Sequence, residues 1–139
     1  MRVEPYLMFA GRCDEALAFY QRAIGAVPEM LMRFADSPEP PAMPLPPGWN
    51  DKVMHSSLRV GDTRVMASDG MSTELPSHAG VTLSITADSE DQARRHFAAL
   101  AEGGQLFMPI GPTFWSPCFG MCRDRFGVHW MVGVDGPQP

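Results

Sequence analysis

The chain has 139 residues, of which 45% are apolar and 19% charged, and its net charge is −5. This length and composition fit a globular domain with its own core and exclude a disordered chain. The eleven Lys and Arg residues are scattered, whereas nucleic-acid-binding proteins show a basic stripe, so we expect no nucleic-acid partner.

No run of the sequence approaches the roughly 18 consecutive apolar residues that a membrane span requires. The first five residues, Met-Arg-Val-Glu-Pro, lack the apolar stretch of a signal peptide. We therefore expect no membrane partner and a cytoplasmic protein.

The first half of the chain predicts one strand, one helix and three further strands. Leu17, Tyr20 and Ile24 recur at helical spacing, Asp14 is placed to cap that helix, and Gly25 is placed to end it. Turn residues such as Gly61-Asp62 separate the later strands. The expected ranges are a strand at 5–10, a helix at 15–24, and strands at 28–35, 52–60 and 63–68.

Residues 37–51 contain six prolines and no periodic pattern. Proline has no backbone N–H to donate, so this stretch cannot pair within a sheet. It predicts a long surface loop or flap.

The second half predicts the same order of elements. Val81, Leu83 and Ile85 alternate with polar residues, as in a strand with one buried face. Ser89 and Gln92 form a capping box at a helix start, and Gly103-Gly104 ends that helix. The ranges of the three further strands are 105–110, 118–123 and 128–134.

The sequence therefore predicts an α+β fold in which a β-α-β-β-β module occurs twice within a single domain, 1–139. The first module covers about 3–70, with an insertion at 37–51, and the second covers about 79–135. Cys13, Cys118 and Cys122 lack metal-ligand spacing and predict free, partly buried thiols. Most of the eleven methionines are expected to fill the core.

Several motifs together resemble the PhnB-like branch of the vicinal-oxygen-chelate superfamily, which includes glyoxalases, bleomycin-resistance proteins and dioxygenases. The most specific are Phe19-Tyr20 late in the first helix and the stretch from Asp124 to Met131, which reads D-x-F-G-x-x-W-M. The others are Pro5-Tyr6-Leu7, Val53-Met54-His55, Gly103-Gly104, Thr113-Phe114-Trp115 and Phe119-Gly120-Met121. The resemblance implies curved mixed sheets around a cleft, and a homodimer.

Enzymes of this superfamily hold a divalent metal with His, Gln or Glu on the first and last strands of each module. Carried over to this chain, those positions fall at Pro5, at Met66 or Ala67, at Gly80 or Val81, and at Met131. None of these is a hard-metal ligand, and thioethers bind such ions poorly. The resemblance thus implies no conventional metal centre, and we expect no cofactor.

A different metal site remains an alternative. His55, His129 and a carboxylate such as Asp69 or Glu74 would form a two-His-one-carboxylate site if they converged. The spacing of these residues along the chain neither supports nor excludes this arrangement.

His55 is the candidate acid–base residue, because it shares one strand face with Val53, Ser57 and Arg59 and can titrate near neutral pH. A structural histidine bonded to nearby backbone is the alternative. The other candidate ligand-binding residues are apolar or polar side chains on the same or corresponding strands and on one loop: Ser57, Met66, Phe114, Trp115, Phe119, Met121, His129 and Met131. Trp130, of opposite parity to His129, is expected in the core, and His78 is expected in solvent.

Three functions are compatible with these features. The leading one is a metal-independent protein that binds a small molecule in its cleft, as in antibiotic sequestration. The others are an enzyme, either a lyase, isomerase or dioxygenase with displaced metal ligands or a metal-free catalyst using His55, and a protein that only associates with a partner.

Members of this branch also carry a demethylubiquinone methyltransferase label. Methyl transfer from S-adenosylmethionine normally needs a larger doubly wound domain with a glycine-rich loop, and the sequence shows neither. We therefore do not expect that activity.

Overall fold

The computed structural model describes residues 1–136, and within them it contains two α-helices and eight strands. In chain order the elements are β1 (Tyr6–Met8), α1 (Cys13–Ile24), β2 (Val27–Arg33), β3 (Val53–Val60), β4 (Thr63–Ser68), β5 (Thr82–Thr86), α2 (Glu90–Ala101), β6 (Gln105–Gly111), β7 (Phe119–Arg123) and β8 (His129–Gly133). Two short 3-10 helices, η1 (Phe34–Asp36) and η2 (Trp49–Asp51), flank the proline-rich stretch. Neither α-helix is long and apolar enough to cross a membrane.

The strands form two four-stranded sheets that are both open, with the orders β1-β4-β3-β2 and β5-β8-β7-β6. In each sheet the first strand of the module pairs in parallel with the last, and the other pairs are antiparallel. This confirms the predicted pair of βαβββ modules. The chain divides into two compact units between Pro76 and Ser77, within the stretch that the sequence leaves between the two modules.

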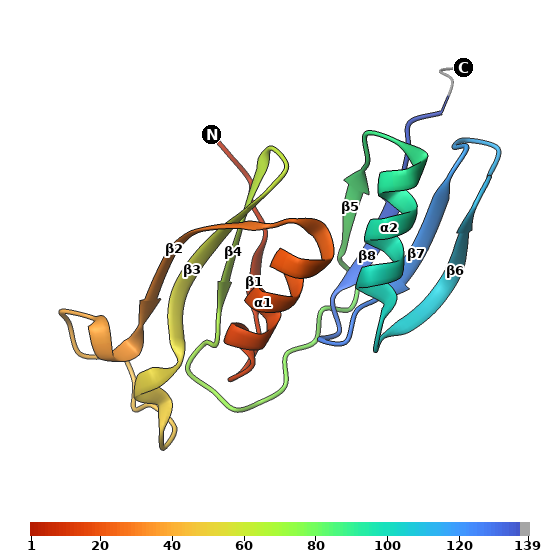
Figure 1. Ribbon diagram of the computed structural model, residues 1–139. Coiled ribbons are helices and arrows are strands. Elements are labelled where there is room, and N and C mark those ends of the chain that lie inside the picture. Colours follow the sequence, from red (N-terminus) through yellow and green to blue (C-terminus); the bar gives the residue numbers. More distant parts are fainter. Residues whose placement is uncertain (137–139) are drawn as a thin grey trace. The chain divides into compact units, whose positions relative to one another are not determined.

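In the first unit, helix α1 covers one face of its sheet, as Figure 1 shows, and the opposite face carries no helix. The covered face holds the core, in which the directly paired Leu58 and Val65 of the sheet and Leu17 of α1 are all buried. Gly25 ends α1 in the left-handed conformation, as predicted. Because α1 and the core lie on the covered face, the other face of the sheet is available for a site.

The start of α1 differs from the prediction that Asp14 caps it. Asp14 lies in the first turn and forms an ion pair with Arg33 at 2.9 Å. The capping acceptor is instead the buried carboxylate of Asp69, just after β4, whose Oδ1 accepts hydrogen bonds from the backbone N–H groups of Gly11 and Cys13. Its Oδ2 accepts from the N–H of Val53, so one carboxylate joins three chain segments.

In the second unit, helix α2 likewise covers one face of the sheet. Ser89 caps it by accepting a hydrogen bond from the N–H of Gln92, as predicted, although the Gln92 side chain reaches Asp88 instead of Ser89. Trp130 is buried at 4% exposure, which confirms its predicted core position.

The D-x-F-G-x-x-W motif has a structural explanation. The buried carboxylate of Asp124 accepts hydrogen bonds from the backbone N–H of Phe126 and Val128 and, at 2.8 Å, from the indole N–H of Trp130. Gly127 has a φ of +89°, which favours glycine, and it completes the turn. The motif therefore fixes the β7–β8 turn against the core.

The methionines contradict the prediction that most of them fill the core. All eleven lie in the described part of the chain, and none is buried. Register explains this, because directly paired residues point to the same side of a sheet, and methionines pair with one another or with small polar residues on the uncovered faces. The equivalent rows run Tyr6, Met66, Ser57, Met30 in the first sheet and Ser84, Met131, Met121, Met108 in the second.

The three cysteines are free, as predicted, and fully buried. Burial raises the pKa of the Cys13 thiol to about 12, with the nearby Asp69 carboxylate adding to the rise, and burial raises the pKa of Cys122 to about 11.

Because the thiolate is the reactive form, we expect the native protein at pH 8 to react with a thiol-specific disulfide reagent roughly a hundredfold more slowly than the urea-unfolded protein. Stability should fall as pH rises above about 9, since the thiols of Cys13 and Cys122 lose their protons there in the unfolded chain but keep them in the folded chain, where their pKa values are raised. Rapid native labelling of any of the three thiols would contradict this expectation.

Candidate functional site

A pocket of about 670 Å³ lies on the uncovered face of the first sheet, and every residue that lines it belongs to the first unit. Its floor comes from β1, β3 and the end of β4, and its wall comes from the stretch between η1 and residue 42. The lining residues are Tyr6, Met8, Phe34, Ser37, Glu39, Pro40, Pro41, Ala42, Met54, Ser68, Gly70 and Met71. A volume of this size fits a drug-sized molecule.

One residue of the floor, Tyr6, is hydrogen-bonded to a second titratable side chain that is not itself part of the lining. The hydroxyl of Tyr6 lies 2.8 Å from Nδ1 of His55, and their rings are 5.5 Å apart. Burial raises the pKa of Tyr6, and the neighbouring Ser68 hydroxyl offsets part of that rise. Tyr6 therefore stays a neutral donor and acceptor at neutral pH, and His55 decides which role its hydroxyl takes towards the pocket.

Most other polar groups of the lining are already bonded within the chain. The Ser68 hydroxyl donates to the Val53 carbonyl and accepts from the N–H of Gly70. The Ser37 hydroxyl bonds the main chain of Glu39 on both sides. The Tyr6 hydroxyl and the Glu39 carboxylate are thus the polar groups that the pocket offers to a ligand.

The proline-rich stretch 37–51 forms no strand, as predicted, but Trp49 near its end is not on the surface. Trp49 is only 5% exposed, and its indole N–H donates to the carbonyl of Gly70 at 2.7 Å. Its ring also lies against the turn at Gly11, where an added Cβ would stand 3.4 Å from the ring. Trp49 therefore fastens the loop to Gly70, a residue of the pocket lining.

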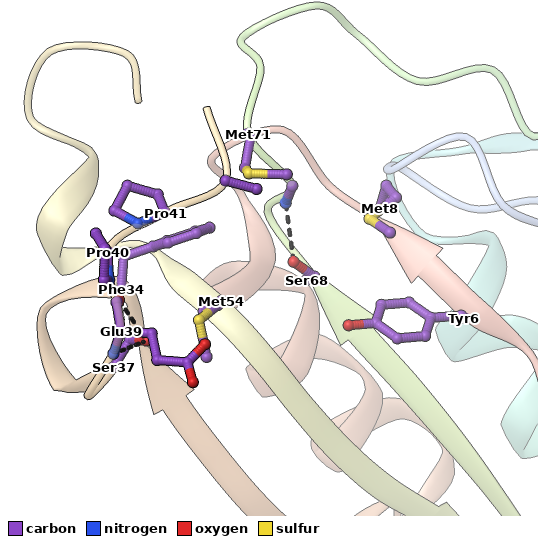
Figure 2. A pocket seen from close by; sticks show the side chains of 12 residues that line it. Tyr6, Met8, Phe34, Ser37, Glu39, Pro40, Pro41, Met54, Ser68 and Met71 are labelled. Atoms are coloured by element: carbon purple, nitrogen blue, oxygen red, sulfur yellow. Dashed lines mark hydrogen bonds between the residues drawn. The ribbon is translucent and has the colours of Figure 1, made fainter. Parts of the chain in front are cut away.

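Figure 2 shows how the pocket residues are grouped. Phe34, Glu39 and Met54 gather on one side, with the two prolines of the wall above them. Tyr6 and Met8 lie on the opposite side, and the Tyr6 hydroxyl points back towards the first group. Ser68 and Met71 lie between these groups.

The predicted ligand-binding residues lie on or beside the uncovered faces, but none of them lines this pocket. In the first unit, Met66 and Ser57 pair directly, and His55 reaches the pocket through its bond to Tyr6. Val53, grouped with His55 by alternation, is fully buried, because the β2–β3 register shifts between Met32 and Arg33.

In the second unit, Met121 and Met131 pair directly, and His129 stacks on Phe107 with ring centroids 5.6 Å apart. Phe114, Trp115 and Phe119 form a chain of edge-to-face rings, in which Phe114 is 95% exposed. Ligand binding by these residues stays a prediction. His78, expected in solvent, is half-buried, with its Nε2 shielded from water.

The donor groups do not fit a conventional divalent metal. Met66 on β4 and Met131 on β8 occupy equivalent places in the two sheets. Met66 pairs with Tyr6 on β1, and Met131 pairs with Ser84 on β5. Gly80 lies before β5 begins. Of the two carboxylates named for the alternative site, Asp69 already accepts backbone N–H groups at both oxygens, and the version with Glu74 stays a prediction. Residues 1–136 contain no cluster of three His, Cys, Asp or Glu suited to a metal.

Sequence reasoning missed most of the pocket. Phe34 and Met71 carried no motif, and Glu39 lay in a stretch without periodicity. The one usable signal was Pro5-Tyr6-Leu7 beside Val53-Met54-His55, two of the motifs that carried the resemblance. They contribute Tyr6, Met54 and the bonded partner His55.

Comparison with known proteins gives a consistent result. The family model described as 3-demethylubiquinone-9 3-methyltransferase matches residues 1–133. Protein YjdN of Escherichia coli is 34% identical over 148 residues, which cover 100% of this chain and 99% of that protein. The crystal structure of protein PA1353 from Pseudomonas aeruginosa is 44% identical, with a TM-score of 0.85 and coverage of 97% of this chain and 98% of that one.

Two further structures show the fold alone. The PhnB protein from Bacillus cereus is 24% identical with a TM-score of 0.77, covering 96% of this chain and 99% of that one. A glyoxalase/bleomycin-resistance/dioxygenase domain from Frankia is 13% identical with a TM-score of 0.66, covering 98% of each chain. The chain therefore belongs to the PhnB-like family described as 3-demethylubiquinone-9 3-methyltransferase, and it has the glyoxalase/bleomycin-resistance fold.

Proposed function

We propose that the protein binds a small, largely apolar organic molecule in the pocket of the first unit, without a conventional metal centre. The observation that carries this proposal is the pocket itself, an open hollow of about 670 Å³ lined mainly by aromatic, thioether and proline side chains with few uncommitted polar groups. Such linings are typical of small-molecule sites.

The methionines support this function over a purely structural one. Met8 and Met71 are 40% and 36% exposed and line the pocket. Flexible thioether side chains on an exposed surface adapt to different ligand shapes and contact aromatic rings favourably. They add nothing to the core of the unit, so a ligand is the natural partner for them.

The family description names a methyltransferase, and that activity is not part of the proposal. The described residues form two open mixed sheets with one helix each, whereas the usual fold for S-adenosylmethionine is a doubly wound parallel sheet. The expectation that this chain transfers no methyl group stays a prediction.

A thermal-shift screen with small aromatic and aliphatic compounds tests the proposal. A ligand present at a hundred times its dissociation constant should stabilise the protein by about 2.7 kcal/mol. Phe34→Ala removes a ring of the wall and should weaken binding about tenfold, since a buried aromatic contact contributes roughly that much. Met43→Ala is the matched control, because Met43 lies in the same proline-rich stretch, is 51% exposed and does not line the pocket.

Two results would contradict the proposal. One is a screen in which no compound class raises the melting temperature. The other is a stoichiometric transition metal in protein purified without a metal-affinity tag, lost in His55→Ala, which would favour a metal-dependent lyase, isomerase or dioxygenase.

We also propose that the protein forms a homodimer, as the resemblance implies. Exposed apolar side chains in the second unit support this, with Leu106 at 54%, Phe107 at 48% and Phe114 at 95% exposure. Analytical ultracentrifugation at micromolar concentration should give twice the monomer mass. A single species of 15.3 kDa would refute the dimer.

A further inference from the structure

We infer that the pocket of the first unit selects an organic cation, an amine or quaternary ammonium on an apolar body, with the Glu39 carboxylate as its counter-ion. This inference rests on the proposed function and names the ligand class of the same site. It starts from the charge of the lining: among residues 1–136, no Lys or Arg lines the pocket, and Glu39 supplies its one carboxylate.

The Glu39 carboxylate has no hydrogen bond or ion pair with any other residue of the described chain. The main chain at Glu39 is nevertheless held, because its N–H donates to the Ser37 hydroxyl at 3.3 Å and its carbonyl accepts from that hydroxyl at 3.0 Å. These two bonds fix the backbone from which the Glu39 side chain extends. In Figure 2 it lies on the side of the pocket that the Tyr6 hydroxyl faces.

Four other acidic residues of the first unit form ion pairs with arginines. Asp14, Glu15 and Glu29 each pair with an arginine, and Glu4 pairs with Arg64. Arginines are thus abundant on this unit, yet none is placed at the pocket. Glu39, the one carboxylate of the lining, has no cationic partner among residues 1–136.

The rest of the lining favours the same ligand class. The faces of the Phe34 and Tyr6 rings carry negative electrostatic potential and attract cations, and the thioethers of Met8, Met54 and Met71 are polarizable. A carboxylate or phosphate ligand would meet Glu39 and no basic side chain. A neutral ligand would fill the volume and gain nothing from the charge.

Tyr6 adds a second polar contact. When the Tyr6 hydroxyl donates its hydrogen bond to Nδ1 of His55, the Tyr6 oxygen is able to accept a hydrogen bond from an ammonium N–H. An amine that carries N–H groups can then bond both Glu39 and Tyr6. A quaternary ammonium can interact only with the charge and the rings.

Three probes with the same apolar body test the inference: 4-phenylbutylamine, 4-phenylbutanol and 4-phenylbutyrate. Isothermal titration at low ionic strength should show the amine binding about three- to tenfold more tightly than the alcohol and the carboxylate binding most weakly, as expected for a partly exposed charge pair with cation–π contacts. Raising the salt concentration should weaken binding of the amine and leave the alcohol unaffected, because salt screens the pair.

Glu39→Gln should bring the affinity for the amine down to that for the alcohol, with the alcohol unchanged. Glu74→Gln is the matched control, since it removes the same charge from an exposed residue of the same unit that does not line the pocket, and it should leave all three affinities unchanged.

The outcomes separate the inference from the proposed function. Equal affinities for the amine and the alcohol, or an amine preference that persists in Glu39→Gln, would overturn the cation inference while the pocket still binds. A preference that Glu74→Gln abolishes equally would show that net charge, and not this site, is responsible. Binding of none of the three probes would overturn both.

Discussion

Asp69→Ala should destabilise residues 1–76 by about 3 kcal/mol or more, because it leaves three backbone N–H groups without an acceptor, each at a cost of about 1–3 kcal/mol. Two of these groups lie at Cys13, where α1 begins, and at Gly11 in the preceding turn, in which Ala10 has a φ of +49°. That conformation is strained for a residue with a side chain and needs support from its surroundings. The third, at Val53, begins β3.

Urea unfolding followed by circular dichroism measures the loss of stability, and hydrogen–deuterium exchange assigns it to residues 1–76. Asp69→Asn keeps one acceptor oxygen for Gly11 and Cys13 and should cost less than the alanine variant. Asp62→Ala, in an exposed hairpin turn, should stay within about 0.5 kcal/mol of the wild type.

The loss should also reach the pocket, since Gly70 and Met71 follow Asp69 directly. We expect weaker binding of the amine probe even where the variant remains folded. Faster exchange spread evenly over both units, or no loss of stability, would contradict the role of Asp69 as the support of the first unit.

Local signals predicted the elements well because each depends on neighbouring residues. Gly25 and Ser89 act at their own helix ends, and Gly61-Asp62 turns its own hairpin. The cap of α1 escaped prediction because its acceptor, Asp69, lies 56 residues from Cys13. Sequence reasoning chose the nearby Asp14 as the cap of α1, but Asp14 forms an ion pair with Arg33 instead.

The methionines show a second limit of sequence reasoning. Alternation indicates that a strand has two unlike faces, but it does not say which apolar face a helix covers. In both sheets the covered face took the branched and aromatic residues, such as Val65 and Trp130, and the other face took methionine. The resemblance drew attention to Met66 and Met131, which lie on those uncovered faces, yet it gave no indication of a wall built from an insertion.

The second large effect is expected at Trp49, which decides whether that insertion forms a wall. Trp49→Ala removes a buried indole and should lower the stability of the first unit by about 3–5 kcal/mol. Trp49→Phe keeps much of the packing but leaves the Gly70 carbonyl without its donor, so it should cost about 1–2 kcal/mol. Both values follow from urea unfolding. Trp115→Ala, at a tryptophan that is 44% exposed in the second unit, should cost less than about 1 kcal/mol.

Binding gives the decisive comparison between these variants. Trp49 holds the end of the proline-rich stretch against Gly70, so its loss frees the wall that contains Phe34 and Glu39. At a temperature where Trp49→Phe and Trp49→Ala remain folded, affinity for the amine probe should fall in that order and stay unchanged in Trp115→Ala. If Trp49→Ala lost stability but bound the probe as the wild type does, the proline-rich stretch would form no part of the ligand site, and the uncovered strands alone would have to hold the molecule.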